Sequence, residues 1–166
     1  MDDGWRLEGM AAFRDGEHDV ALSYAVDCAA DWMTRRGTVR GFRGDASIDW
    51  TIERDAASRW TLNGEEIAAV RGLRDLDYGF TPAPNLLHLR RVEVPAGTTA
   101  EIPVAWLELS AGTLAVLPQR YERRSERTYW YEAPTQSFEG ELVLGEDGFA
   151  ERYPELWVRE GSTTGL

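Results

Sequence analysis

The stretch Val20–Cys28, with the sequence VALSYAVDC, decides the class of fold. Every second residue in it is apolar, and the residues between them are small or polar. Because successive side chains of a strand point to opposite faces of a sheet, this pattern predicts a strand with one buried face. Cys28 ends the buried row and is the single cysteine of the chain, so we expect a buried structural thiol and no intramolecular disulfide.

The same alternation recurs along the chain, over residues 47–53, 101–106, 114–120 and 138–144. Turn sequences separate these stretches. Asn63-Gly64 is the strongest hairpin candidate, because a type I′ turn needs a positive φ at both positions. No stretch shows a convincing helical period; residues 65–76 come closest, but Gly72 interrupts them.

These patterns predict an all-β fold with little helix. We expect a single-domain antiparallel rolled sheet, half-barrel or barrel of about 10–12 strands, since many short strands must curl to bury their apolar faces. The 166 residues suffice for one domain with a sizeable core. The domain is expected to span residues 1–160, with residues 161–166 as a frayed tail.

The segment Asp75–Arg91, DLDYGFTPAPNLLHLRR, departs from the alternation. Pro82 and Pro84 lack an N–H and fix φ, which argues against a helix or a central strand in this segment. We therefore expect a loop whose backbone groups are bonded by polar side chains. Those side chains are Asp75, Asp77, Thr81 and Asn85.

Asp75 and Asp77 share one side of the segment if it is extended. Paired carboxylates can act as acid and base or bind a metal. The alternative is that they pair with Arg90, Arg91 or Arg120, or cap loop amides, and the sequence favours it because no other metal ligand lies near. Arg90 and Arg91 alternate faces of an expected strand, so at most one points inward, toward an acid or toward a phosphate or sugar.

Two further pairs of residues are candidates for a ligand site. Gln119 and Tyr121 share one face of a strand, where they would suit sugar hydroxyls on a cavity wall or form a surface ladder. Tyr129 and Tyr131 likewise share a face, for stacking on a sugar or for packing in the core. Trp106 lies within an apolar row and is expected in the core.

Composition excludes several classes of partner. The net charge is -11, from 29 acids against 18 basic residues that are all arginine, which opposes binding to nucleic acid and to anionic lipid surfaces. No apolar run approaches the roughly 20 residues of a membrane helix. The first residues, MDDGWRLEG, lack the apolar segment of a secretory signal, so a cytoplasmic location is expected.

The sequence lacks the short motifs of the common enzymes. There is no HExxH, CxxC, GxSxG, GxxxxGK[ST] or GxGxxG. His18 and His88 do not form a metal pair by their spacing. We therefore expect neither a metal nor a cofactor, and an enzymatic activity has little support.

An ordered set of landmarks resembles the putative glycolipid-binding family of bacterial proteins over nearly the whole chain. The landmarks in this sequence are Trp60, Asp75-Leu76-Asp77, Thr81-Pro82, Asn85-Leu86-Leu87, Arg90-Arg91-Val92, Gln119-Arg120-Tyr121, Tyr129 and Tyr131, Asp147-Gly148, and Tyr153-Pro154. The resemblance implies a rolled antiparallel sheet (a spiral β-roll), similar to the half-barrel of bacterial lipoprotein carriers. It also implies a glycolipid ligand, by analogy of shape.

We therefore expect a non-enzymatic binding protein that holds an amphipathic ligand, a glycolipid, on the concave face of a curled sheet. Acyl chains would lie along inner apolar rows, and the polar head would meet the candidate residues. The rows are expected to include Leu22, Tyr24, Ile48, Trp50, Ile102, Val104 and Trp106. The expected ligand-binding residues are Asp75, Asp77, Thr81, Asn85, Arg90, Gln119, Tyr121, Tyr129 and Tyr131.

Two alternatives stay open. The first is an enzyme on a polar or sugar substrate, with Asp75 or Asp77 as acid or base, which requires a carboxyl inside a pocket with a raised pKa. The second is a structural or interaction module in which the polar clusters only hold loops together. Substitutions of Asn85 and Arg90 would then reduce stability without a binding defect.

Overall fold

The structure, a computed structural model, describes residues 3–153 and 155–160. Strand makes up 55% of the chain and helix 9%, which confirms the all-β prediction. The described residues contain fifteen strands in three sheets, more than expected, because several strands are only two or three residues long. The expected tail, residues 161–166, lies outside the described residues.

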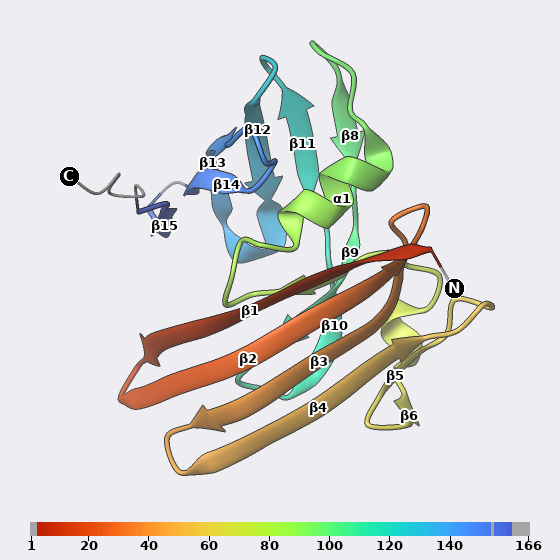
Figure 1. Cartoon of the computed structure of the whole chain (residues 1–166), viewed down its shortest axis with the longest axis vertical. Helices are drawn as coiled ribbons and strands as arrows, with labels where there is room; N and C mark the ends of the chain where they lie inside the picture. The colour runs from red at the N-terminus through yellow and green to blue at the C-terminus, as the bar shows by residue number, and fades with distance from the viewer. Residues whose placement is uncertain (1–2, 154, 161–166) are drawn as a thin grey trace.

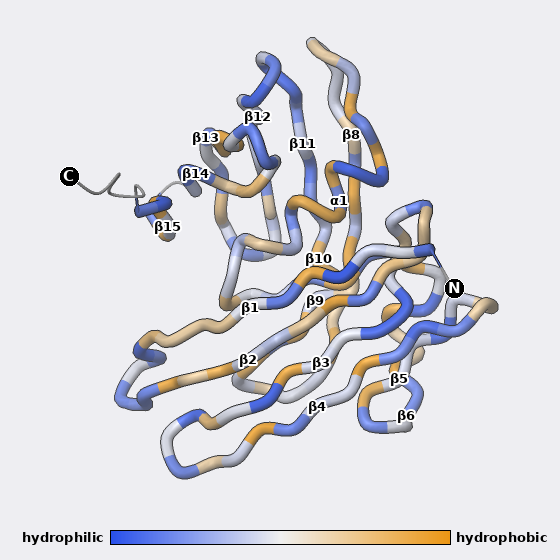
Figure 2. Tube along the Cα trace, in the orientation of Figure 1, coloured by the Kyte–Doolittle hydropathy of each residue, from blue (hydrophilic) through white to orange (hydrophobic). Residues whose placement is uncertain are grey.

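Sheet A is built from the first six strands in sequence order, and every neighbouring pair is antiparallel. Its strands are β1 (Gly4–Asp15), β2 (His18–Ala29), β3 (Thr34–Arg43), β4 (Ala46–Arg54), β5 (Trp60–Leu62) and β6 (Glu65–Glu66). The turn between β5 and β6 is the expected Asn63-Gly64, with φ values of 50° and 85°. In Figure 2 the tips of the β1–β2 and β3–β4 hairpins are hydrophilic.

Sheet B has three strands in the order β10–β9–β7. They are β7 (Leu76–Tyr78), β9 (Val104–Glu108) and β10 (Thr113–Leu117). β7 and β9 run parallel, so the expectation of a purely antiparallel fold is wrong for this pair. Parallel neighbours need a long crossover, and residues 79–103, which include α1, supply it.

Sheet C completes the fold with six strands in the order β15–β14–β13–β12–β11–β8, and its pairs are antiparallel. They are β8 (Thr99–Glu101), β11 (Arg120–Arg123), β12 (Thr128–Ala133), β13 (Phe138–Leu144), β14 (Ala150–Tyr153) and β15 (Trp157–Val158). In Figure 1 sheet A forms the lower layer, with α1 and sheet C above it.

The segment with two prolines ends in a helix, α1 (Asn85–Val92), which corrects the expectation of a loop and strand. Two 3₁₀ turns, η1 (Ala68–Val70) and η2 (Pro134–Gln136), are the other helical elements of the described residues. Pro84 is the N-cap of α1, a place where its missing N–H costs nothing. Glu93 is the C-cap of α1. It has a left-handed φ of 48°, and its N–H donates to the Leu89 carbonyl.

Two hydrophobic cores fill the interior. Leu22 and Ile48 of sheet A pack in the core that sheet B covers, and Ile102 and Val104 belong to the core shared by sheet C and α1. These four side chains are at most 6% exposed, so the expectation that acyl chains lie along them is wrong. Trp106 is only half-buried and lines the pocket described below.

The single thiol is buried, as expected. Cys28 is 3% exposed at the end of the inner row of β2. Burial raises the pKa of Cys28 to about 12, and a hydrogen bond with Thr34 opposes part of that rise. The thiol therefore remains protonated and unreactive at neutral pH.

Candidate functional site

A pocket of about 320 Å³ lies between sheets B and C, beside the segment that leads into α1. Six of its fifteen lining residues are aromatic. The aromatic lining residues are Tyr78, Trp106, Tyr131, Phe138, Tyr153 and Trp157. The polar lining residues are Asp77, Thr81, Asn85 and Gln136. A concave site with apolar walls and a few polar groups is the usual form of a small-molecule site.

Three of the rings pack together because their strands are neighbours in sheet C. The Phe138 and Tyr153 rings are stacked, with centroids 5.1 Å apart and planes 22° apart. The Tyr131 ring is tilted against both, at 5.8 Å from Phe138 and 5.5 Å from Tyr153. The pairing of β12 with β13 and of β13 with β14 places these rings on one continuous surface.

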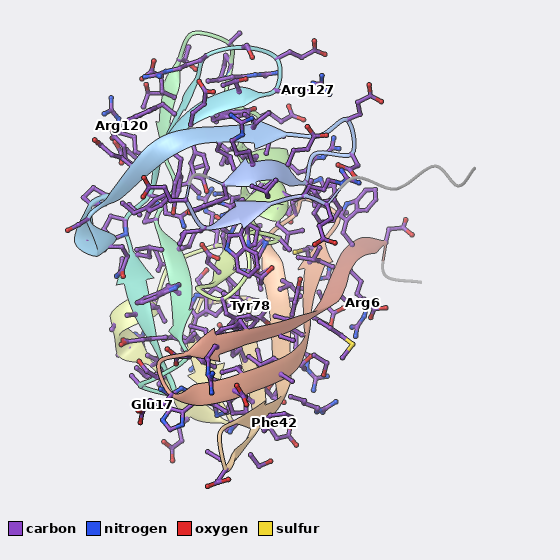
Figure 3. All side chains as sticks on the ribbon, turned by 90° about the vertical axis from the view of Figure 1, so that its left-hand side faces the viewer. Arg6, Glu17, Phe42, Tyr78, Arg120 and Arg127 are labelled. Atoms are coloured by element: carbon purple, nitrogen blue, oxygen red, sulfur yellow. The ribbon has the colours of Figure 1, made fainter. Side chains whose placement is uncertain are left out.

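β7 delivers side chains to both sides because a strand alternates its faces. The Tyr78 hydroxyl donates to the Ala25 carbonyl of β2 at 2.8 Å, which ties β7 to sheet A. Figure 3 shows Tyr78 between the N-terminal sheet below and the C-terminal sheet above. Asp77 points the other way, toward Gln119, and meets the pocket.

A chain of hydrogen bonds joins Asn85 to Asp77, the two lining residues that we call the floor of the pocket. The Nδ2 of Asn85 donates to the Tyr121 hydroxyl at 2.6 Å, and that hydroxyl donates to the Oε1 of Gln119 at 3.1 Å. The Nε2 of Gln119 then donates to the Oδ2 of Asp77 at 2.7 Å. Each residue is at most 6% exposed. Each of these hydrogen bonds is donated in the direction of Asp77. The four side chains come from β7, α1, β11 and the residue before β11, and they form one connected network.

The carboxyl of Asp77 is in an unfavourable place for a charge. Burial raises the pKa of Asp77 above its ordinary value, while the nearby His88 and the hydrogen bond from Gln119 oppose the rise. The Nε2 of His88 lies 3.1 Å from the Leu76 carbonyl, and its Nδ1 has no partner among the described residues. Burial likewise raises the pKa of Tyr121, so its hydroxyl keeps its proton.

Asp75 has a different partner and does not line this pocket. Both of its carboxylate oxygens accept bonds from Arg91, at 2.8 and 2.6 Å. Asp75 is 1% exposed and the Arg91 side chain 16%, so the pair is a largely buried, bidentate ion pair. The expected pairing of one acid with one arginine is therefore present, and it joins β7 to the end of α1.

Arg90 and Tyr129 lie in a separate cleft of about 800 Å³ between α1 and sheet C. The helix explains their separation from the pocket, since adjacent residues of a helix point about 100° apart and Arg90 therefore turns away from Arg91. Arg127 also lines this cleft. In Figure 3 Arg127 is at the upper right of the molecule, well away from Tyr78.

The predicted ligand-binding residues thus fall into distinct groups. Those that line the pocket are Asp77, Thr81, Asn85 and Tyr131, and those directly bonded to its floor are Gln119 and Tyr121. Those outside it are Asp75, Arg90 and Tyr129. Sequence reasoning found only part of the aromatic wall: Tyr131 was predicted as a ligand-binding residue, and Trp106 was placed in the core and in the apolar rows expected to contact acyl chains. Tyr153 was noted only as a landmark.

Comparison with known proteins places the chain in a family. A family profile described as "Putative glycolipid-binding" matches residues 1–159. The chain belongs to this family. The crystal structure of a DUF1089 family protein from Pseudomonas aeruginosa is similar in fold, with 24% identity and a TM-score of 0.81 over 95% of this chain and 92% of that one. Comparison with curated proteins gives no match.

Among the described residues of this family member, no group of three or more histidine, cysteine, aspartate or glutamate side chains could hold a metal ion. No helix within residues 3–153 and 155–160 is long and apolar enough to cross a membrane.

Proposed function

We propose that the protein is a non-enzymatic binding protein for an amphipathic ligand, a glycolipid, whose polar head occupies the pocket between sheets B and C. The observation that carries this proposal is the buried chain of hydrogen bonds under the aromatic wall. Aromatic faces suit the C–H faces of a sugar ring, and carboxylate and amide groups suit its hydroxyls. The family description supports the same class of ligand.

The apolar part of the ligand has a place at the rim of the pocket. The C-terminal segment presents Leu156 at 60%, Trp157 at 39% and Val158 at 77% exposure, and Leu156 and Trp157 line the pocket. Because Leu22 and Ile48 of sheet A are packed in the core, we place the acyl chain on Leu156, Trp157 and Val158, which we call the apolar lip. The proposal therefore keeps the amphipathic ligand but places it in the pocket and at its rim, whereas the sequence led us to expect it on the concave face of a curled sheet.

The first experiment identifies the ligand class. Native mass spectrometry of freshly purified protein, followed by organic extraction, is expected to show an added mass that extracts as a glycolipid. Isothermal titration with n-octyl β-D-glucoside below its micelle concentration is expected to show saturable binding. Absence of both an extracted lipid and saturable binding would contradict the proposal.

A variant pair ties that binding to the pocket. Trp157→Ala removes an exposed ring from the rim and is expected to weaken octyl glucoside binding about two- to tenfold, since an aromatic contact is worth about 0.5–1.5 kcal/mol. Trp5→Ala is the matched control, because Trp5 is 51% exposed and stacks on Trp32 instead of lining the pocket. Equal effects of the two substitutions would place the ligand elsewhere.

The second candidate is an enzyme with Asp77 as a general acid, favoured by the raised pKa of this carboxyl inside a pocket. Binding is favoured over it because the described lining contains no second carboxylate, whereas glycoside hydrolysis generally uses two. Release of nitrophenol from p-nitrophenyl glycosides, abolished by Asp77→Asn, would support the enzyme. The cytoplasmic location expected from the sequence also stays a prediction, which cell fractionation would test.

A further inference from the structure

The charge of the pocket is set by one side chain. Asp77 is the one carboxylate among the described lining residues, and that lining contains no arginine and no histidine. The arginines of the neighbouring helix are placed elsewhere, since Arg91 holds Asp75 and Arg90 lines the separate cleft. The pocket therefore offers an anionic ligand no cationic side chain.

Backbone donors do not replace the missing cation. A helix N-terminus binds anions through the free N–H groups of its first turn, and α1 begins at the pocket. However, the N–H groups of residues 85–87 already donate to the carbonyls of residues 82–84, over 2.9–3.2 Å. The N-cap, Pro84, has no N–H. The start of α1 is thus closed as an anion site.

The groups that remain open in the floor accept hydrogen bonds. An ionised carboxylate only accepts, and Gln119 bonds one oxygen of Asp77. Asn85 uses its Nδ2 on Tyr121, and its side chain makes no other hydrogen bond with described residues, so its Oδ1 remains an acceptor. A ligand that fits this floor must bring donors, as the hydroxyl groups of a polyol do.

We propose that this pocket selects an uncharged, hydroxyl-rich head group and rejects anionic head groups, an inference that rests on the proposed function. A phosphate, sulfate or carboxylate in the floor would face Asp77 with no cationic side chain in the described lining, and unpaired like charges at an interface are strongly unfavourable. A quaternary ammonium would suit the rings and Asp77. It has no hydroxyl donor for Asn85, so a sugar fits the floor more completely.

Three amphiphiles with the same octyl tail test this selectivity. We would titrate the protein with n-octyl β-D-glucoside, n-octyl phosphate and octyltrimethylammonium, each below its micelle concentration, and measure each Kd by calorimetry. The glucoside is expected to bind at least about tenfold more tightly than either charged probe. Equal or tighter binding of the phosphate or the ammonium overturns the selectivity but not amphiphile binding. Absence of binding by all three overturns the proposed function as well.

Two variants show which side chain sets the selectivity. Asp77→Asn removes the charge but keeps the shape, and is expected to raise the affinity for octyl phosphate relative to octyl glucoside about tenfold. Its matched control is Glu139→Gln, which removes the same charge from an exposed position on β13 outside the pocket lining. An unchanged ratio of the two affinities in Asp77→Asn contradicts the proposal.

A gain-of-charge variant keeps the test valid if Asp77→Asn does not fold. Gln136 lines the pocket from η2 and is exposed, so Gln136→Arg adds a cation at the rim with little effect on the core. We expect it to tighten octyl phosphate binding several-fold. Thr135→Arg, one residue away and outside the pocket lining, is the control. If Gln136→Arg does not tighten octyl phosphate binding, the lack of a cationic side chain is not the cause of the selectivity.

Discussion

Asp75 and Asp77 are two residues apart and are both buried, but their carboxylates have partners of different charge. Asp75 is held by both arms of an arginine, whereas Asp77 accepts from the neutral amide of Gln119. A buried charge with a fork-shaped counter-ion is fully partnered, but one bonded only by neutral groups is costly. The comparison therefore separates an acid that joins β7 to α1 from an acid that is left for a ligand.

The largest effect is expected from breaking the ion pair. Arg91→Met keeps much of the apolar stem but leaves Asp75 buried without a counter-ion, which should lower the free energy of unfolding by about 3–5 kcal/mol. Urea denaturation measures this change. Arg90→Met is the control on the neighbouring exposed arginine and should change stability by no more than about 0.5 kcal/mol. If both variants lose the same free energy of unfolding, the loss in Arg91→Met does not come from the ion pair.

The hydrogen-bond chain on the Asp77 side is expected to give the second-largest effect. Tyr121→Phe removes the hydroxyl between Asn85 and Gln119 and leaves buried polar atoms unpartnered, at a cost of about 1–3 kcal/mol. Thermal unfolding measures it. Tyr129→Phe is the matched control, because the Tyr129 hydroxyl bonds no other described residue. A Tyr121→Phe protein as stable as the control would show that the chain does not form.

A smaller effect is expected in the pH dependence of the free energy of unfolding, through the raised pKa of Asp77. The pKa of Asp77 is raised in the folded state, so the folded protein binds that proton more tightly and is destabilised as pH rises from the ordinary aspartate range through the raised pKa. Asp77→Asn removes this loss. The variant should therefore be more stable than the parent at neutral pH, with the difference vanishing toward pH 3. A difference that grows in acid would contradict the direction of the shift.

The smallest effect concerns the apolar lip. Val158→Ser changes a side chain that is 77% exposed, so stability should stay within about 0.5 kcal/mol while octyl glucoside binding weakens a few-fold. Val116→Ser, at a 42% exposed residue of β10 outside the pocket lining, is the control for both quantities. If octyl glucoside binds both variants equally, the tail does not lie on the lip.

The sequence predicted the strands well because their signal is local. Alternation along residues 20–28 and 138–144 marks β2 and β13, and Asn63-Gly64 marks its hairpin turn. α1 was missed because eight residues carry too little helical period, and because prolines next to a helix look like breakers even when they form its start. The parallel pair β7–β9 was missed because no local pattern encodes which distant strand becomes a neighbour.

The candidate site was predicted in part, for the same reason. Asp77, Asn85, Gln119 and Tyr121 were grouped through a family resemblance, and the structure brings their side chains into one bonded chain. Arg90 was misplaced because a strand was assumed where a helix rotates it away. Tyr131 was predicted, but Phe138 and Tyr153 were not predicted beside it, because each ring occupies an ordinary position of its strand and only the pairing of β12, β13 and β14 brings the three together.

The parallel pairing of β7 with β9 also sets an order of assembly. The hairpins of β1 to β4 join residues that are close in the chain, so they can form as soon as they leave the ribosome. β7 cannot gain its partner in sheet B until residues 79–103 have crossed over and β9 has been made. Tyr153 and Trp157 follow sheet A and most of the other pocket residues in the chain, so the pocket is completed only after sheet A has been made. A chain released before residue 153 would contain sheet A without the complete binding site.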